Sequence, residues 1–516
     1  MVNHSRLVLV GRVLAPLLSI LFLSLFLLAT PYPPGLDGYY YSLQVKSLAL
    51  TGEVLAEDPS WVYGFLGWIN SFVQNPLISP RLGVLFSALL SLSFLAYWKK
   101  PNPWTPLIVL TLGLMPQWFY FHMEFVKNAL SLTTLLGAFW FLGRVHPQKH
   151  PKSWWLWGCG ALVLGFLTWQ GHRMMGLLLL MTLGLWCFHW LWSKMKERFG
   201  SLKAGIGLGL GLGIALGAGF GLLFILGWTD RMADLGLRFD GPLHRLGVFL
   251  KIKPVSAEMG WYLLLQIGIP LHALYLLLRR GSLTRESIVF LLVALFCVFP
   301  FFDFSWSGGG FRLFLVAPVF WALHFLSLGT KKSQSLGSSR QPNWGRVLKV
   351  GFGSLLCLFL LLGQVEVFST WHKKKSPPYS RLLKEMAPLV HVAQGYRLIA
   401  HRGLSTMIWY ELGIQTENFA QKENQSLYMR LVEGVKRDDF ENLLGPEETL
   451  PDFKSQRYVL VPEKIFVRYL TKWRGFGTLK SNLNPLEVRP LSGFSINQRA
   501  TVLLSPITYG KGVSEP

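Results

Sequence analysis

The chain has 516 residues, of which 51% are hydrophobic, 14% aromatic and only 15% charged, with a formal net charge of +23. A soluble domain usually carries about a quarter charged residues, whereas the charges here lie in short clusters between long apolar runs until about residue 370. This pattern excludes a wholly soluble enzyme and predicts membrane segments followed by a soluble domain. No basic stripe with interleaved aromatic residues occurs outside the apolar part, so the positive charge does not indicate nucleic-acid binding.

Apolar stretches of the roughly 20 residues that a helical span needs recur about eleven times. The first follows Arg6 and Arg12 and has no small-residue cleavage site after it, which favours an uncleaved signal-anchor. The expected fold class is mainly α, a polytopic bundle of transmembrane helices. The stretches lie at 10–30, 82–98, 104–121, 126–143, 154–170, 174–193, 203–227, 260–278, 286–302, 311–329 and 347–368.

Lysine and arginine residues predict the orientation, because they collect in short loops that stay cytoplasmic. With the N-terminus inside, the short basic loops all fall on the cytoplasmic side: 99–100, 144–152, 194–203, 279–285 and 331–346. An odd number of spans then places the C-terminal part outside. We therefore expect a bundle over residues 1–369 and an extracytoplasmic domain over 370–516.

The outer loop at 31–80, which we assign to the bundle, is too weakly apolar to span. A helix is expected from just after Asp37 to Leu50. Apolar residues from Trp61 to Val73 share one helical face opposite Asn70, which predicts a helix lying in the membrane interface or packed on the bundle. The C-terminal domain reads as a small α/β domain, with strands at 397–400, 458–462 and 499–504 and helices at 380–392, 406–412 and 464–470.

Polar residues at the predicted outer ends of the spans are the candidates for a site, because ionisable groups near a membrane are costly and often functional. Each also has a simpler explanation, Asp37 as a helix N-cap and the others as polar residues of helical hairpins. Together they place carboxylates and cations on one face of the membrane. They are Asp37, then His122, Glu124 and Lys127, then His172 and Arg173, and finally Arg312.

This mixture suits the transfer of a group from a phosphorylated lipid. A carboxylate deprotonates an incoming hydroxyl, and arginine neutralises a departing phosphate through bidentate hydrogen bonds. Alternatively, Asp37, Glu124 and His122 hold a divalent metal for the same task. No cofactor is required by the sequence, and the need for a metal stays open.

The arrangement resembles the integral-membrane glycosyltransferases of the GT-C superfamily, which include protein O-mannosyltransferases, the aminoarabinose transferase of lipid A and the oligosaccharyltransferase catalytic subunit. Three segments carry the resemblance: Leu36–Tyr40 after the first span, Glu124–Asn128 at the second outer loop, and Gly310–Phe314 with Ala317-Pro318 late in the bundle. The resemblance implies a catalytic role for Asp37 and a second acidic position at Glu124. It makes Arg312 a candidate ligand of the lipid phosphate. Arg173, His172 and Lys127 are further donor-binding candidates from their place at the outer ends of the spans.

The function expected from the residues and the resemblance is transfer of a sugar from a polyprenyl-phosphate donor to a glycan, lipid or protein acceptor. Transfer would take place on the extracytoplasmic face of a bacterial inner membrane. Two alternatives remain: a multi-pass transporter or lipid flippase, which predicts internal repeats or broken helices, and a non-enzymatic envelope scaffold, which tolerates Asp37→Asn.

Overall fold

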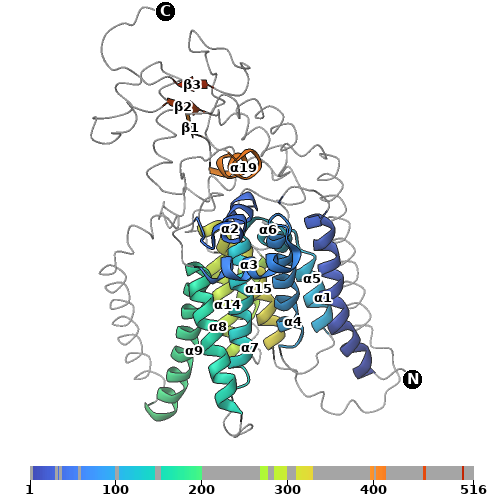
Figure 1. The fold of residues 1–516 in the computed structure, drawn as a ribbon. Coiled ribbons are helices and arrows are strands. Elements are labelled where there is room, and N and C mark those ends of the chain that lie inside the picture. The colour runs from blue at the N-terminus through green and yellow to red at the C-terminus, as the bar shows by residue number, and fades with distance from the viewer. Residues whose placement is uncertain are drawn as a thin grey trace, which may run out of the picture. The chain divides into compact units, whose positions relative to one another are not determined.

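The fold is taken from a computed structural model, which describes about half of the chain and is mainly helical there (Figure 1). The described residues are 4–28, 38–55, 60–98, 104–145, 153–199, 268–276, 284–298, 309–328 and 402–413, together with Pro33 and three short strands. The chain divides into two compact units. Unit 1 holds residues 1–29, 58–65 and 81–366, and unit 2 holds 30–57, 66–80 and 367–516.

Among the described residues, three helices are long and apolar enough to cross a membrane. They are α1 (His4–Leu28), α4 (Ser79–Ala96) and α9 (Arg173–Phe199). Each coincides with a stretch that the sequence predicts to span. The predicted stretches 203–227 and 347–368, and most of 260–278, lie outside the described residues.

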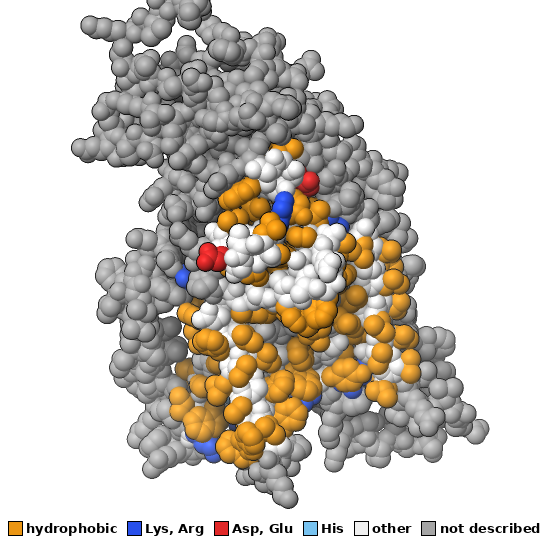
Figure 2. All heavy atoms as spheres, in the orientation of Figure 1, with side chains coloured by type: hydrophobic (Ala, Val, Ile, Leu, Met, Phe, Trp, Pro, Cys, Tyr) orange, Lys and Arg blue, Asp and Glu red, His pale blue; other side chains and the backbone are white. Residues whose placement is uncertain are grey.

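Unit 1 contains further helices besides these three. Those that match predicted stretches are α7 (Val126–Leu142), α8 (Trp154–Gly171), α14 (Arg285–Cys297) and α15 (Gly309–Ser327). Neighbouring helices pack along the chain, α7 on α8, α8 on α9 and α14 on α15, while α14 also packs on α9. Hydrophobic side chains cover most of the visible helix surface, and Lys and Arg lie near helix ends (Figure 2).

The expected single span at 104–121 is wrong in one respect, because the structure divides it into α5 (Thr105–Gly113) and α6 (Pro116–Glu124). Proline has no N–H to continue a helical ladder and disfavours the helical conformation of the residue before it. Met115 is accordingly extended, with ψ 137°. A second bend, of 115°, separates α6 from α7. These two helices count as a fourth candidate span only if they cross the membrane together as one broken helix.

Buried hydroxyl groups join α4, α7 and α8 inside unit 1. The Thr133 hydroxyl of α7 lies 2.7 Å from that of Ser87 and 2.9 Å from that of Ser91, both on α4. Thr168 of α8 donates to Thr134 of α7 at 3.0 Å. Such small polar residues let helices approach closely and hydrogen-bond where no water is available.

At the end of unit 1 where α4, α7 and α15 finish, hydrogen bonds and a cation–π contact join the helix ends. The indole of Trp98 donates to the Ser327 hydroxyl at 3.0 Å, and Thr284 donates to the Ser327 carbonyl at 2.6 Å. Arg144, just after α7, lies over the Trp140 ring and donates to the Tyr97 carbonyl at 3.1 Å. This end therefore carries a fixed cation.

Unit 2 contains α2 (Gly38–Thr51), most of α3 (Trp61–Val73) and α19 (Arg402–Leu412). Its strands β1 (Tyr396–Ile399), β2 (Arg457–Leu460) and β3 (Val502–Leu504) form one sheet in the order β1-β2-β3. β1 and β2 are parallel, whereas β2 and β3 are antiparallel. The predicted helices at 380–392 and 464–470 lie outside the described residues.

The helix predicted after Asp37 and the one predicted at 61–73 are both present as α2 and α3. The face of α3 differs from the expectation, because Asn70 is buried rather than solvated and accepts a hydrogen bond from Ser79 at 3.0 Å. Trp68 and Phe72 are instead exposed. The structure also groups 30–57 and 66–80 with the C-terminal part, and the domain boundary at 369/370 stays a prediction.

Candidate functional site

A group of basic side chains gathers at the end of unit 1 where α8 ends and where α7, α9 and α15 begin. His172 lies between α8 and α9, and Arg173 opens α9. Lys127 lies in the first turn of α7, and Arg312 lies in the first turn of α15. We call these four residues the basic cluster; the positive charges of its Lys and two Arg residues all act on the imidazole of His172.

The imidazole of His172 is held neutral. Its Nδ1 accepts a hydrogen bond from the backbone N–H of Met174 at 3.2 Å, which caps the start of α9 and requires an unprotonated Nδ1. Loss of water around the ring, followed by the charges of Arg312, Lys127 and Arg173, holds the pKa of His172 well below its usual range. The neutral ring therefore carries its proton on Nε2, which is a hydrogen-bond donor.

Two cations of the cluster rest on aromatic rings. The guanidinium carbon of Arg312 lies 4.9 Å from the centre of the Phe125 ring, and the Lys127 ammonium lies 5.8 Å from that of Tyr63. Cation–π contacts of this kind hold a cation in place without neutralising it. The Nε of Arg312 is buried and has no hydrogen-bond partner, so this guanidinium keeps an unused donor.

The end of α8 is fixed by the segment that begins α3. The Trp61 indole donates to the Leu167 carbonyl at 2.7 Å, and the Ser60 hydroxyl donates to the Gly171 carbonyl at 3.2 Å. A Cβ at Gly171 would collide with the Ser131 hydroxyl and would lie 2.8 Å from the Trp61 indole nitrogen. Glycine at 171 thus permits the close approach that positions His172 one residue later.

Chemically, the basic cluster brings together four hydrogen-bond donor groups from its residues: one ammonium, two guanidinium groups and a neutral imidazole Nε2–H. Such a set binds an anion with several oxygen atoms, of which phosphate is the usual example. The four donor-binding candidates expected from the sequence are brought together, although they come from parts of the chain far apart. Their binding role stays a prediction.

Comparison of the sequence with models of known protein families gives no match, and comparison with curated proteins gives none either. Roles for these residues therefore rest on the geometry of the cluster and on the resemblance of short segments.

The two predicted catalytic carboxylates cannot be placed in the same way, since Asp37 and the side chain of Glu124 lie outside the described residues. Pro33 lies close to the start of the next helix, since a Cβ at Gly38 would lie 2.8 Å from that of Pro33. α2 begins at Gly38, so Asp37 directly precedes the helix, as a capping residue would.

His122, the third predicted metal ligand, is fully buried in α6. Its Nδ1 donates to the Trp118 carbonyl at 2.9 Å, and the two rings stack with centres 4.0 Å apart. Its Nε2 has no hydrogen-bond partner. Within the described residues, no three His, Cys, Asp or Glu side chains lie close enough to hold a metal ion, and the metal hypothesis for Asp37, Glu124 and His122 stays a prediction.

Within unit 2, the helix that follows Asp37 is held by a helix of the C-terminal part. The buried Tyr39 of α2 donates to the Glu411 carboxylate of α19 at 2.7 Å. Lys46 donates to the Tyr410 carbonyl at 3.0 Å and lies 4.6 Å from the centre of its ring. These contacts tie the position of α2 to α19.

Sequence reasoning missed the aromatic partners Tyr63 and Phe125 and the capping role of His172. Phe125 follows Glu124 directly and could be suspected as a neighbour. Tyr63 offers no sequence signal, because its contact with Lys127 joins positions far apart in the chain.

Proposed function

We propose that this chain is a polytopic membrane glycosyltransferase, which moves a sugar from a polyprenyl-phosphate donor to an envelope acceptor on the extracytoplasmic face. The bundle would cross a bacterial inner membrane about eleven times, at roughly 20 residues for each span. The C-terminal unit, as a small α/β domain, would lie outside the cytoplasm.

The observation that carries the proposal is the basic cluster at one end of an apolar bundle. A phosphate on a lipid tail is the anion that reaches such a place from the bilayer. Three cations and an imidazole N–H match its oxygen atoms, and the GT-C-like segments around Asp37, Glu124 and Arg312 supply the reaction class.

The residues would divide the work. Asp37 would accept the proton of the attacking acceptor hydroxyl, with Glu124 assisting. Arg312, Arg173 and Lys127 would stabilise the negative charge that develops on the leaving lipid phosphate. His172, held neutral, would donate its Nε2–H to the same phosphate without repelling the cations.

A lipid flippase is the second candidate function, and the broken α6–α7 pair favours it. Discontinuous helices are a feature of transporters, where their ends line the substrate path. A flippase would move the lipid-linked sugar across the bilayer and leave its covalent bonds intact.

The deciding experiment compares envelope glycans by mass spectrometry in a deletion strain that carries either the wild-type protein or Asp37→Asn, at equal membrane expression. We expect the wild type to restore a sugar modification and Asp37→Asn to fail. The mass that is lost identifies the sugar.

Two other results would redirect the proposal. If both proteins restore the same glycans, Asp37 is structural and the catalytic assignment is wrong. If the deletion leaves all glycans unchanged but lipid-linked sugars accumulate on one side of the membrane, the flippase explains the protein better.

A further inference from the structure

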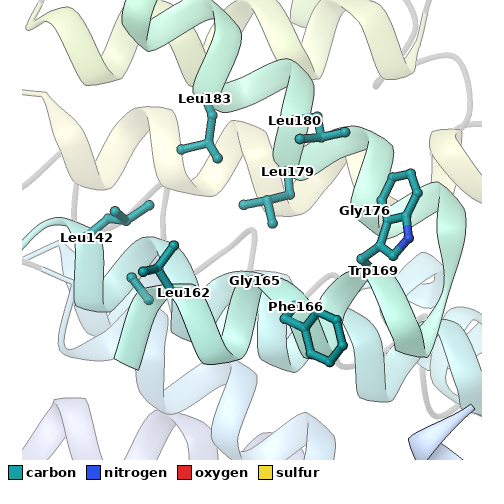
Figure 3. Close-up of a pocket in the computed structure, with 10 residues that line it drawn as sticks. Leu142, Leu162, Gly165, Phe166, Trp169, Gly176, Leu179, Leu180 and Leu183 are labelled. Carbon is teal, nitrogen blue, oxygen red and sulfur yellow. The ribbon is translucent and has the colours of Figure 1, made fainter. Parts of the chain in front are cut away.

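An apolar groove runs along α8 and α9 (Figure 3). It has a volume of ≈ 400 Å³ and is lined by ten residues of α7, α8 and α9, all of them apolar side chains or glycines except for the Trp169 indole nitrogen. A pocket of this size lies within the range of small-molecule sites. Its lining offers almost no polar atom, so its natural occupant is a hydrocarbon.

One end of the groove lies close to the basic cluster. Trp169 lines the groove three residues before His172, and Gly176 lines it three residues after Arg173. Since the backbone N–H of Gly176 donates to the His172 carbonyl at 3.1 Å, the groove begins within one helical turn of the cluster.

The groove is open along its side. Leu162, Phe166 and Leu180 line it and have exposed fractions of 76%, 63% and 53%. From Gly176 to Leu183 it follows α9 for about 10 Å, at 1.5 Å per residue. Exposed apolar surface of this extent marks a binding site or a membrane contact.

We infer that this groove receives the hydrocarbon chain of the same anionic lipid whose phosphate the basic cluster binds, and that the lipid reaches the site sideways from the bilayer between α8 and α9. The inference rests on the proposed function. A lone anion would need no apolar groove, and a neutral lipid would need no cations at its end. An isoprenyl phosphate matches both parts, with its phosphate at His172 and Arg173 and its chain along Phe166 and Leu180.

Glycine at 165 keeps the groove open. A Cβ at this position would lie 3.2 Å from a methyl group of Leu179 across the groove, so a larger side chain at 165 must occupy the space itself. Gly158 provides the matched control, because it lies on the same helix and a Cβ there meets no atom within 4 Å.

The test measures binding of inorganic phosphate, geranyl phosphate and farnesyl phosphate to the full chain in nanodiscs. Wild type and Gly158→Leu should bind more tightly as the isoprenyl chain lengthens. Gly165→Leu should weaken farnesyl phosphate binding about tenfold or more, because losing the burial of two methylene groups alone accounts for that factor. Its affinity for inorganic phosphate should stay unchanged.

Leu180→Trp is the second groove-filling variant, placed on an exposed position that tolerates a larger side chain. A farnesyl phosphate with a photoreactive group at the end of its chain should label α8 and α9 in the wild type and lose that labelling in Leu180→Trp.

The possible outcomes distinguish a failure of the groove inference from a failure of the proposed function. If phosphate binds but chain length and both groove variants have no effect, or if the label lands on other helices of the chain, the groove inference is overturned and the basic cluster stands. If the wild type binds none of the three phosphates, the inference and the proposed donor fall together.

Discussion

Arg312 combines three properties that few arginine residues share: it is half-buried, it rests on the Phe125 ring, and its Nε has no hydrogen-bond partner. A guanidinium in this position is held ready for a bidentate contact, because its planar fork is already oriented.

Replacing Arg312 with alanine should therefore reduce glycosyl transfer about 100- to 1000-fold, the usual effect of losing one donor to a developing anion. Arg312→Lys should recover part of the rate, since it keeps the charge but loses the fork. Rates measured on purified protein with a lipid-linked donor check this. Arg285→Ala, an exposed arginine at the start of α14, is the control and should retain full activity; an equal loss in both variants would contradict the role of Arg312.

His172 links stability to pH. Its pKa is lowered in the folded protein, so the unfolded chain binds a proton more readily, and stability is present above pH 6.5 and lost as the pH falls below it. The loss should be observed as a lower unfolding temperature at pH 5.5 than at pH 7.5. Added phosphate should reduce the loss, because a bound anion raises the pKa of His172.

His172→Asn separates this effect from capping. Asparagine is a good N-cap and does not titrate, so the variant should keep α9 intact while its unfolding temperature depends less on pH between 7.5 and 5.5. A pH dependence identical to that of the wild type would show that another group titrates.

At the level of helices, we expect the few buried hydroxyl groups between α4 and α7 to stabilise the packing of these two helices. Thr133 is shared by two serines of the neighbouring helix, and its replacement by valine preserves shape but removes both contacts. We expect a destabilisation of about 1–2 kcal/mol, from interhelical bonds that contribute roughly 0.6–1.7 kcal/mol each.

Thr182→Val serves as the comparison, because the buried Thr182 donates to the Leu178 carbonyl of its own helix at 2.7 Å and not across helices. Thermal unfolding in detergent should show a smaller shift for Thr182→Val than for Thr133→Val. Equal shifts would mean that the interhelical contacts do not stabilise the bundle.

Helix positions were largely predictable from the sequence, but their ends and interruptions were less so. Long apolar runs located α1, α4 and α9, and the helix expected just after Asp37 coincides with α2. Pro116 divides a run that hydropathy alone treats as continuous. Asn70 is buried because Ser79 offers a partner at the start of the next helix, which a helical-wheel argument cannot include.

For the whole molecule, the sequence predicted that the residues of the basic cluster lie on the same side of the membrane. It did not predict that they lie close together. Their convergence depends on which helices become neighbours, and α15 follows α9 by more than a hundred residues. Likewise, no local pattern indicates that residues 30–57 cluster with the C-terminal unit, because the contacts of α2 with α19 are long-range.

The proposed orientation has a direct test on intact cells. In a variant without the four native cysteines, Asn424→Cys should react with a membrane-impermeant maleimide, because the proposed odd number of spans would place the C-terminal unit outside. Gln148→Cys, in a basic loop between α7 and α8, should react only after the membrane is permeabilised. The reverse pattern would invert the bundle and move the proposed reaction to the cytoplasmic face.

α7 carries Lys127 in its first turn and is followed by Arg144, and at 1.5 Å per residue these cations lie about 25 Å apart along its axis. This separation is close to the thickness of a bilayer's hydrocarbon core, about 30 Å. In a membrane, the two cations would fix the depth of α7. Moving the helix along the bilayer normal in either direction would bring one cation into the hydrocarbon core, at a free-energy cost of about 2.5–3.5 kcal/mol. The bilayer's own thickness would then set the depth at which the basic cluster meets a lipid headgroup.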